Sequence, residues 1–533
     1  MFEIKATDLA GRIGEIRTKS GLLETPCILP VIHPVRQSIA PKEMKKMGFK
    51  AVMTNAYITL KVFGKKAEEK GIHKIINYDG IIMTDSGGYQ VLEYGSVEVN
   101  PVEMAIFQEK IGSDMALVLD TPTGIGVDKK RASETVKITL KAAEETLKAI
   151  KAEGTLWVGP IQGGSYIDLL KKSAKLTSKM GFDLFALGSP TEVMESYDFD
   201  LLAKMIIAVK QSLPIDKPLH LFGAGHPLTI PLAVALGCDL FDSASYMLYA
   251  REGRYMTDYG TLRFDELTYL PCNCPVCSEY TLKEMKELEY EERTKKIATH
   301  NLNVLSKEFK ATKQAIEDGR IWEYLGMKAK AHPKLWEAFK LLIDHYEFLE
   351  DGTPLFKPRA LFFYGFYDLM RPESLRYHKR ILEDISIPSE KKTLLILPES
   401  DVKPFYKSPF YIKLANALGN ALKEIQICFL ALPFGVMPVE LSDVYPLSQY
   451  VSAIRPDGYV MREILERTKE FIRKHPFEKV ILLNKLDAYN PIFKRMVRSI
   501  RNCDIINVTS TANNFDEIVE EILMNVAKGK SQV

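Results

Sequence analysis

The stretch GIIMTDSGGYQ at residues 80–90 contains the pattern on which the fold prediction rests. Its apolar half, residues 80–83, has the composition of a short buried strand, and this strand leads directly to Asp85. Gly87 and Gly88 then allow the backbone to approach a ligand closely, and Tyr89 offers a flat face for stacking. A strand that ends in an ordinary Asp-containing turn has the same sequence pattern, so this stretch alone does not establish a site.

The same pattern, an apolar run followed by polar residues, recurs along the first half of the chain. Eight such runs alternate with charged, helix-like segments such as residues 131–153 and 200–212. The runs are residues 27–31, 51–54, 81–84, 116–119, 156–161, 183–187, 218–222 and 239–241. Eight alternating β and α units over about 220 residues predict an α/β fold of the (β/α)8 TIM barrel type. A doubly wound open sheet is also compatible with the alternation.

Polar residues follow the predicted strands at positions that would form the mouth of such a barrel. They are Asp85, Asp120, Gln162 with Gly163 and Gly164, Gly188 with Ser189 and Pro190, Gly223 with Gly225, and Asp242. Active sites of (β/α)8 barrels lie at this carboxyl end of the strands, so the pattern predicts an active site. Its three carboxylates can act as nucleophile, as general acid or base, or as ligand acceptor. Together with an amide and glycine backbone groups, they suit a flat heterocycle with donors and acceptors on its edge.

Length and composition describe a globular chain of more than one domain. The 533 residues exceed a single ordinary core, and 46% hydrophobic and 26% charged residues are typical of such proteins. No apolar run approaches the roughly 20 residues of a membrane span, and residues 1–5 lack a signal peptide's apolar segment. We therefore expect no membrane association and a cytoplasmic location. A formal charge of +2 neither requires nor excludes nucleic acid as a partner.

Three of the seven cysteines form a cluster that predicts a metal site. Cys272, Cys274 and Cys277 are followed by His300, which shares the inward face of a helical segment with Ile297. A lone histidine on such a face is ordinarily a core residue, but three nearby thiols in a reducing compartment favour a Cys3His zinc site. Because four protein ligands complete the tetrahedron, this zinc ion is expected to be structural.

A metal-dependent hydrolase is another function that a barrel with a zinc site suggests. The closed ligand set argues against it, because a catalytic zinc ion keeps a position for water or substrate. His33 and His226, each followed by proline, are expected to be loop residues and not metal ligands at strand ends.

The last third of the chain, residues 355–533, has the pattern of a second and smaller α/β domain. Strand-like runs occur at residues 393–397, 425–429 and 480–483, and helix-like segments at residues 458–475 and 515–528. The barrel domain is expected to end near residue 350, so the two domains are joined by only a few residues.

Taken together, the motifs of the first domain resemble those of the tRNA-guanine transglycosylases. The resemblance rests on TDSGGYQ at residues 84–90, IQGG at 161–164, FDS at 241–243 and CNCPVC at 272–277 with His300. It covers residues 1–350 and implies a (β/α)8 barrel with a zinc-binding insertion at residues 272–300. Enzymes of this family exchange a guanine in tRNA for a 7-deazaguanine base through a covalent bond between an aspartate and the ribose.

The resemblance also implies roles for residues at the mouth of the barrel. Asp242 corresponds to the nucleophile that attacks C1′ of the ribose, and Asp85 to the general acid and base for the leaving and incoming bases. Residues expected to bind the edge of the base are Asp120, Gln162, Gly188 and Ser189, and those expected to sandwich its faces are Tyr89 and Phe222. Many relatives have two glycines after the sixth strand, whereas this chain has Gly188-Ser189-Pro190, in which proline removes a backbone donor.

Residues 188–197 and the long C-terminal extension are more similar to the archaeal branch of the family. That branch replaces guanine 15 in the D-loop of tRNA with 7-cyano-7-deazaguanine (preQ0) during the biosynthesis of archaeosine. The expected partners are therefore tRNA, guanine and preQ0. The alternatives are a queuine-type enzyme that acts on the anticodon guanine and a non-catalytic paralogue subunit that binds tRNA. The presence of Asp85 and Asp242 argues against the subunit.

Residues 355–533 resemble a domain of archaeosine synthase and of some archaeal transglycosylases. Lys403 is similar to the lysine of the synthase motif, but the cysteine usually found upstream is absent from residues 397–400. We therefore expect a structural or RNA-positioning role for this domain. Many archaeal relatives end in an RNA-binding PUA domain, which we do not recognise here. A separate PUA-domain protein or the C-terminal domain itself is expected to hold the tRNA. A homodimer is an alternative assembly.

Overall fold

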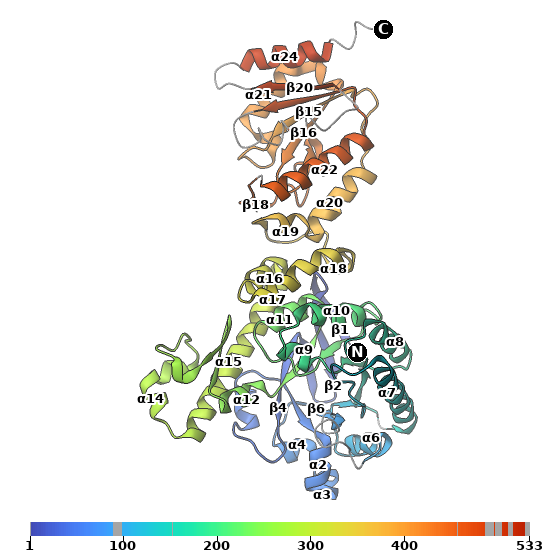
Figure 1. Cartoon of the computed structure of the whole chain (residues 1–533), viewed down its shortest axis with the longest axis vertical. Coiled ribbons are helices and arrows are strands. Elements are labelled where there is room, and N and C mark those ends of the chain that lie inside the picture. The colour runs from blue at the N-terminus through green and yellow to red at the C-terminus, as the bar shows by residue number, and fades with distance from the viewer. Residues whose placement is uncertain are drawn as a thin grey trace. The chain divides into compact units, whose positions relative to one another are not determined.

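The structure, a computed structural model, describes residues 2–88, 99–151, 153–455, 457–484, 495, 504–509 and 515–527. The chain divides into two compact units, Met1–Pro354 and Leu355–Val533 (Figure 1). Each contains strands and helices in alternation. Within the described residues, every helix is too short or too polar to cross a membrane.

The first unit is built on a closed barrel of eight parallel strands. They are β4 (Cys27–Ile32), β5 (Ala51–Asn55), β6 (Ile81–Asp85), β7 (Met115–Leu117), β8 (Leu156–Ile161), β9 (Leu184–Leu187), β10 (Leu219–Leu221) and β11 (Leu240–Ser243). Each strand pairs with the next one in sequence, and β11 pairs with β4. The predicted barrel is therefore confirmed, and the open sheet is excluded because every strand has two partners.

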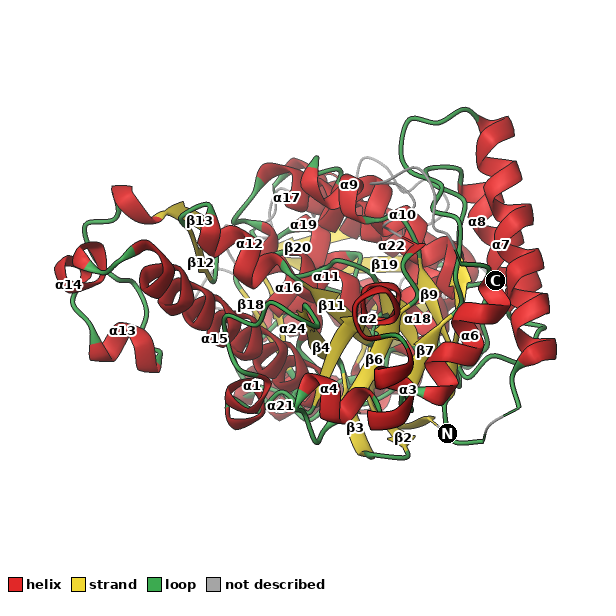
Figure 2. Cartoon of the chain, turned by 90° about the horizontal axis from the view of Figure 1, so that it is seen from below, coloured by secondary structure: helices red, strands yellow, loops and turns green. Residues whose placement is uncertain are grey.

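Helices from the connections cover the outside of the barrel, as Figure 2 shows for α6, α7 and α8 around β6 and β7. The helices are α1 (Pro41–Lys46), α2 (Ala56–Phe63), α3 (Lys65–Lys70), α4 (Ile72–Ile76), α6 (Pro101–Lys110), α7 (Lys129–Ala149), α8 (Ile167–Thr177), α9 (Thr191–Glu195), α10 (Phe199–Lys210), α11 (Thr229–Ala235) and α12 (Ser245–Arg251). The two long helices α7 and α10 overlap the predicted segments 131–153 and 200–212, although α7 ends four residues earlier than predicted. Each begins after an aspartate, Asp128 or Asp198, whose carboxylate accepts a bond from a backbone amide of the first turn.

A three-stranded antiparallel sheet closes the amino end of the barrel. It consists of β1 (Phe2–Asp8), β2 (Gly11–Thr18) and β3 (Gly21–Thr25). Ile16 and Leu23 of this sheet belong to the same apolar cluster as Ala51 and Ile81, which begin barrel strands. The guanidinium of Arg12 also donates two hydrogen bonds of 2.7 Å to the buried carboxylate of Asp239, just before β11. Within the described part of the chain this end is filled, which leaves the carboxyl ends of the strands for a ligand.

An insertion separates the last barrel strand from the helix that packs beside it. It contains β12 (Arg254–Thr257), β13 (Gly260–Arg263), α13 (Pro275–Glu279) and α14 (Leu282–Glu287), and the chain returns through α15 (Tyr290–Glu317). In Figures 1 and 2 the insertion extends away from the barrel on the side of α12 and α15. Helices α16 (Ile321–Ala329), α17 (Pro333–Leu341) and α18 (Tyr346–Gly352) complete the unit.

The second unit has a five-stranded sheet in the order β17-β16-β15-β19-β20. The strands are β15 (Thr393–Pro398), β16 (Ile425–Ala431), β17 (Gly435–Pro438), β19 (Lys479–Asn484) and β20 (Asp504–Thr509), of which β17 alone is antiparallel to its neighbour. A separate parallel pair joins β14 (Leu361–Phe363) to β18 (Tyr450–Ser452). The helices include α20 (Pro372–Glu383), α21 (Pro409–Leu418), α22 (Gly458–Lys474) and α24 (Phe515–Ala527). The predicted second α/β domain is present.

Lys403 lies in the loop after β15 and is held against β18. Its ammonium group donates to the carbonyl oxygen of Tyr450 at 2.7 Å and lies 3.1 Å from the centre of the Tyr450 ring. Burial lowers the pKa of Lys403 to about 8, and the nearby Glu399 carboxylate partly offsets this effect. Glu399, at the end of the same loop nearer to β15, accepts a hydrogen bond of 2.9 Å from the Tyr450 hydroxyl. These contacts attach the loop to β18.

Candidate active site

Strand periodicity places three polar side chains above the apolar layer inside the barrel. Alternate residues of a strand point to the same side, so residues two apart share the interior. The apolar interior residues Met53, Met83 and Leu240 are followed two positions later by Asn55, Asp85 and Asp242. The polar side chains therefore point inward at the carboxyl ends of β5, β6 and β11, where the strands end.

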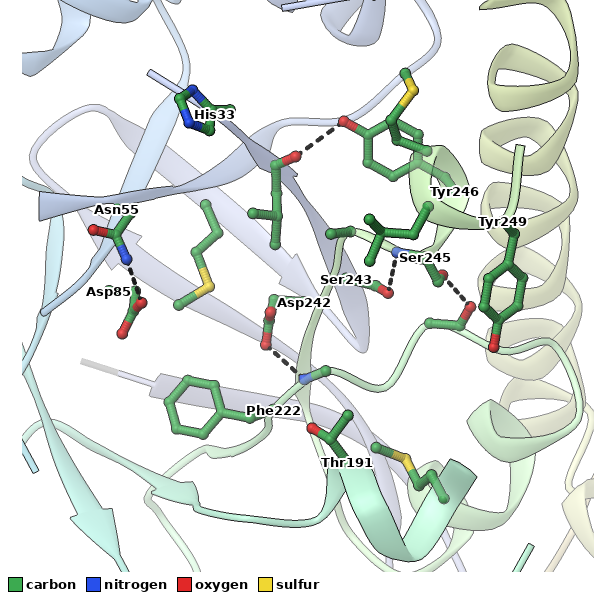
Figure 3. Close-up of a pocket in the computed structure, with 18 of the residues that line it drawn as sticks. His33, Asn55, Asp85, Thr191, Phe222, Asp242, Ser243, Ser245, Tyr246 and Tyr249 are labelled. Atoms are coloured by element: carbon green, nitrogen blue, oxygen red, sulfur yellow. Dashed lines mark hydrogen bonds between the residues drawn. The ribbon is translucent and has the colours of Figure 1, made fainter. Parts of the chain in front are cut away.

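A cavity of about 850 Å³ opens at this end of the barrel (Figure 3). Of the residues predicted for catalysis or base binding, it is bordered by Asp85, Asp120, Gln162, Gly188, Ser189, Phe222 and Asp242. Tyr89, the other predicted stacking residue, lies outside the described residues. The barrel therefore brings seven predicted residues, spread over 158 positions of sequence, to one cavity. His33 and His226 lie in loops, as expected, and also border it.

Asp85 lies at the wall of this cavity beside Asn55. The Asn55 side-chain amide donates to Oδ2 of Asp85 at 2.8 Å, and the Gly87 amide donates to Oδ1 at 3.3 Å. Burial raises the pKa of Asp85 to about 7, because the charged form loses hydration, and the neighbouring carboxylates of Asp120 and Asp242 add to the shift. Near neutral pH this carboxyl group therefore exists in both protonation states, as a group that both gives and accepts protons must.

Asp242, on β11, has a different environment at the wall of the same cavity. Its Oδ1 atom accepts hydrogen bonds from the ring nitrogen Nε2 of His220 at 2.8 Å and from the Gly223 amide at 3.1 Å. Gly223 has a φ of +66°, a left-handed conformation that glycine adopts without strain. Two donors on one oxygen stabilise the ionised form of a carboxylate and fix its orientation. The side chain is thus held in one orientation at the wall of the cavity.

Asp120, Gln162 and Ser189 form a connected hydrogen-bond network. The Gln162 amide nitrogen donates to Oδ2 of Asp120 at 2.5 Å, and its carbonyl oxygen accepts from the Thr123 amide at 3.0 Å and the Ser189 hydroxyl at 3.1 Å. Two donors at the carbonyl end determine which way the amide points. Burial raises the pKa of Asp120 to about 6. The network presents an ordered row of polar groups to a planar ligand.

The loop after β9 is shaped by close packing against Gln162. A Cβ atom on Gly188 would come within 2.2 Å of the Gln162 amide nitrogen, so a larger residue there would displace the Gln162 amide from its hydrogen bonds. Ser189 follows with a φ of +59°, which is strained for a residue with a side chain. Pro190 caps the short helix α9, where its missing amide hydrogen is not needed for the network described above. The Ser189 hydroxyl thereby joins the network of Asp120 and Gln162.

The four predicted metal ligands meet in the insertion. The donor atoms of Cys272, Cys274, Cys277 and His300 all lie within 4.8 Å of one another. Nδ1 of His300 is 3.5 Å from the sulfur of Cys274 and 3.4 Å from that of Cys277. A nitrogen and a sulfur on the same tetrahedral zinc ion are separated by about 3.6 Å. The arrangement therefore fits a tetrahedral Cys3His site.

Neighbouring groups orient the histidine of this site. Its other nitrogen, Nε2, lies 2.8 Å from the Met256 carbonyl oxygen, so Nε2 carries the hydrogen and Nδ1 is directed to the thiols. The Tyr255 ring stacks on the imidazole at 3.6 Å between centroids, and its hydroxyl lies 3.1 Å from the sulfur of Cys277. The hairpin β12–β13 thus supports ligands that belong to α13 and α15.

Sequence reasoning missed two residues of the site, Asn55 and His220. Both are strand residues at interior positions, and His220 was visible as a polar residue within the apolar run of residues 218–222. The inward parity of His220 follows from its pairing with Leu240 of the interior cluster. The signal for both was a polar residue in a strand position whose side chain points to the same side as the apolar residues of the barrel interior. Their partners, however, depend on how the barrel closes.

Comparison with known proteins agrees with this site. A family model described as queuine tRNA-ribosyltransferase matches residues 8–334. A second model, described as a domain of unknown function (DUF5591), matches residues 375–527. The two matches lie within the two compact units of the structure.

Three curated relatives carry the name tRNA-guanine(15) transglycosylase. The protein of Aeropyrum pernix is 42% identical over 455 residues, which are 84% of this chain and 87% of the relative. That of Saccharolobus solfataricus is 42% identical over 496 residues, 91% of this chain and 97% of the relative. That of Pyrobaculum aerophilum is 40% identical over 513 residues, 94% of this chain and 98% of the relative. By its barrel, by the family model and by these relatives, the chain belongs to the tRNA-guanine transglycosylase family.

Proposed function

We propose that this chain replaces guanine 15 of tRNA with 7-cyano-7-deazaguanine, on the route to archaeosine. The observation that carries the proposal is that two carboxylates of contrasting environment, Asp85 and Asp242, border one cavity. Two titratable groups whose surroundings differ in this way are suited to different tasks, proton transfer and nucleophilic attack. The name shared by the relatives supplies position 15.

The first half of the reaction removes guanine from the tRNA. The free oxygen of Asp242 attacks C1′ of the ribose, a C–O bond forms, and the bond from C1′ to N9 of guanine breaks. The electron pair of that bond leaves with guanine, which is a poor leaving group unless it is protonated. Protonated Asp85 donates this proton, and its pKa of about 7 makes the protonated form available near neutral pH.

The second half attaches the new base to the same carbon. Ionised Asp85 accepts the proton of the incoming deazaguanine, whose nitrogen then attacks C1′ and displaces Asp242. Two displacements at one carbon retain the stereochemistry of the glycosidic bond. One carboxyl group thus gives a proton and later takes one, and both protonation states are accessible to Asp85 because its pKa lies close to neutral pH.

Base recognition is assigned to the network of Asp120, Gln162 and Ser189, with Gly188 allowing close approach. The carboxyl and amide groups present acceptors and donors toward the cavity, in keeping with the edge of a purine. Phe222 borders the cavity beside Asp242 and supplies one stacking face (Figure 3). The target base must first leave its stack in the tRNA, which costs about a few kcal/mol.

The zinc ion proposed for Cys272, Cys274, Cys277 and His300 has no part in these steps. When bound, it supplies cross-links between the loop of residues 272–277 and helix α15, with all four positions taken by protein ligands. The insertion therefore needs a compartment in which thiols stay reduced, and we place the protein in the cytoplasm.

A base-exchange assay tests the proposal. The purified chain is incubated with unmodified archaeal tRNA and labelled guanine or labelled 7-cyano-7-deazaguanine, with and without a PUA-domain protein. Label should enter the tRNA, and a tRNA with adenine in place of guanine 15 should take up none. Incorporation that depends on the anticodon guanine would support a queuine-type enzyme, and no incorporation under any condition would overturn enzymatic activity on tRNA.

The variant Asp242→Asn tests the nucleophile. A carboxamide cannot form the ester-like bond to C1′, so the adduct between protein and tRNA that survives denaturation should disappear and exchange should fall at least a thousandfold. Gel electrophoresis of denatured reactions measures the adduct. An adduct of wild-type amount in Asp242→Asn would contradict the role given to Asp242.

A further inference from the structure

His220 is a fully buried titratable residue that the reaction steps above do not use. It belongs to the short strand β10, and its ring lies within the barrel, level with Ala186 and Leu240 of the neighbouring strands. The ring also packs against Phe222, with 4.8 Å between ring centroids. An imidazole in an apolar interior, directly beneath a cavity, requires a reason, because an unpartnered polar group there costs free energy.

The hydrogen bonds of Asp242 supply that reason. Nε2 of His220 is 2.8 Å from Oδ1, and the Gly223 amide reaches the same oxygen at 3.1 Å. Among the described residues, no hydrogen bond reaches the second oxygen, Oδ2. A carboxylate that is held through one oxygen keeps the lone pairs of the other free for attack. The side of Asp242 that faces the cavity is therefore set by the donors on the opposite side.

The protonation state of His220 follows from the surroundings of its other nitrogen. Within the described part of the chain, Nδ1 is buried and has no hydrogen-bond partner. An imidazolium would place a second N–H donor at that position without an acceptor, which is costly in a buried site. The ring is therefore neutral, with its hydrogen on Nε2 and directed to Asp242. A neutral donor orients the carboxylate without neutralising its charge.

We propose that His220 is a positioning residue that, as a neutral Nε2–H donor, fixes Oδ1 of Asp242 and reserves Oδ2 for attack on C1′. This inference rests on the proposed function, in which Asp242 is the nucleophile. His220 therefore affects the rate at which the covalent bond forms. It does not contribute to the binding of base or tRNA, because His220 lies below the cavity and is not among the residues that border it.

Two variants separate this role from simple packing. His220→Leu keeps an apolar side chain of moderate size but removes the donor, whereas His220→Gln can place an amide N–H near the position of Nε2. Loss of one hydrogen bond to a charged group predicts that kcat and the rate of adduct formation fall about ten- to a hundredfold in His220→Leu, while KM for guanine and tRNA stays within about threefold. His220→Gln should recover most of the rate. The thermal midpoint and zinc content of both variants serve as controls for folding.

A spectroscopic measurement tests the hydrogen bond without any reaction. In full-length protein labelled with 15N-histidine, the signal that is absent from His220→Gln belongs to His220. It should show a neutral ring with hydrogen on Nε2, and it should shift in Asp242→Ala. A ring protonated on Nδ1 alone, or one unaffected by Asp242→Ala, would overturn the assignment.

Failure of the proposed function and failure of the His220 role give different results. A wild-type chain that transfers no base to tRNA overturns the proposed function, and the nuclear magnetic resonance measurement then decides on the His220–Asp242 pair by itself. In an active wild-type chain, a slow His220→Leu and a restored His220→Gln support the positioning role. The positioning role is overturned if His220→Leu keeps the wild-type kcat. It is also overturned if kcat falls equally in both variants while KM rises, and His220 is then a packing residue.

Discussion

At the scale of single residues, the site depends on giving similar side chains different surroundings. Asp85 and Asp242 border one cavity, yet the first has a pKa raised to about 7 by burial and the second is held by His220 and Gly223. Each environment follows from the strand that carries the residue. Differences of this kind separate proton transfer from nucleophilic attack without any change in residue type.

Because the pKa of Asp85 is raised, the variant Asp85→Asn should have a higher free energy of unfolding than the wild-type protein above pH 7. An ordinary aspartate titrates near pH 3.8, so between about pH 4 and pH 7 the unfolded chain has lost a proton that the folded chain still holds. The free energy of unfolding therefore falls as pH rises through this window, and the loss is complete above pH 7. Asp85→Asn, which does not titrate, should exceed wild type by on the order of 1 kcal/mol at pH 8 and show little difference near pH 4.

Denaturant unfolding at the two pH values measures this difference. Exchange activity serves as the companion measurement, since a carboxamide cannot carry the proton and the rate should fall about a hundredfold or more. Equal stability of wild type and Asp85→Asn at pH 8 would contradict the raised pKa.

Two substitutions of Ser189 distinguish the effect of its backbone strain from the effect of its hydroxyl hydrogen bonds. Its hydroxyl donates to Gln162 and accepts from the Gly124 amide, while its φ of +59° is strained. Ser189→Ala removes the hydroxyl and keeps the strain, whereas Ser189→Gly removes both. Both variants should raise KM for the base about three- to tenfold, and Ser189→Gly should be more stable than Ser189→Ala by about 1 kcal/mol. Steady-state kinetics and thermal unfolding measure the two effects, and an unchanged KM in both variants would remove Ser189 from base recognition.

At the scale of elements, the short helices and irregular backbone around the Cys/His cluster lead us to expect that the insertion depends on a bound metal ion. Residues 272–274 have no regular structure, α13 and α14 are short helices with one buried residue each, and the three thiols are partly exposed. Helix α15, in contrast, buries Ile297, Leu302 and Leu305 against the rest of the first unit. A small segment that cannot bury enough apolar surface ordinarily needs a metal or a disulfide to stay folded.

Cys274→Ser is therefore expected to lose bound zinc and to unfold the insertion locally. Metal analysis should fall from about one zinc ion per chain to nearly none, and hydrogen exchange should accelerate in residues 254–287 while the barrel strands keep their protection. Cys27→Ser, which removes a thiol of β4 outside the cluster, is the matched control and should retain zinc. Full zinc content in Cys274→Ser would refute the site.

At the scale of the whole molecule, the cavity lies in the first unit, whereas the excess of basic over acidic residues lies in the second. All described residues of the cavity belong to the first unit, in which Lys and Arg number 45 against 48 Asp and Glu. In residues 355–533 the numbers are 26 and 21, so the second unit carries the positive excess. A positive excess favours contact with the phosphates of tRNA, which fits the RNA-positioning role expected for this unit.

A chain that ends at Pro354 is expected to keep the chemistry and lose affinity for tRNA. Because the first unit has its own core, it should fold with zinc and show a kcat within about threefold of the full chain at saturating tRNA, while KM for tRNA rises about tenfold. The salt dependence of KM should also weaken, since fewer phosphates are contacted. Exchange assays over a range of salt measure both effects, and an unchanged KM would remove the second unit from tRNA binding.

Local patterns were sufficient for the architecture and for most of the predicted residues that border the cavity. Eight apolar runs predicted the barrel because buried parallel strands are continuously apolar, and the residues that follow them identified the mouth. The Cys/His cluster was predictable because three of its four members lie within six residues of one another. The boundary of α7 was less accurate, since the helix ends at Ala149 and the pattern of charged residues continues to Glu153.

The sequence by itself determined that Asp85, Asp120, Gln162 and Asp242 lie at the mouth of the barrel, because each stands where an apolar strand ends. Only the tertiary structure decided what those residues touch. Asp242 meets His220 from 22 positions away, Asp85 meets Asn55 from 30, and Asp120 meets Gln162 from 42. These pairs depend on the register in which neighbouring strands close, and the raised pKa of Asp85 depends on burial, which no local pattern specifies. The identity of the reactive groups is thus local, whereas their protonation and orientation come from the closed barrel.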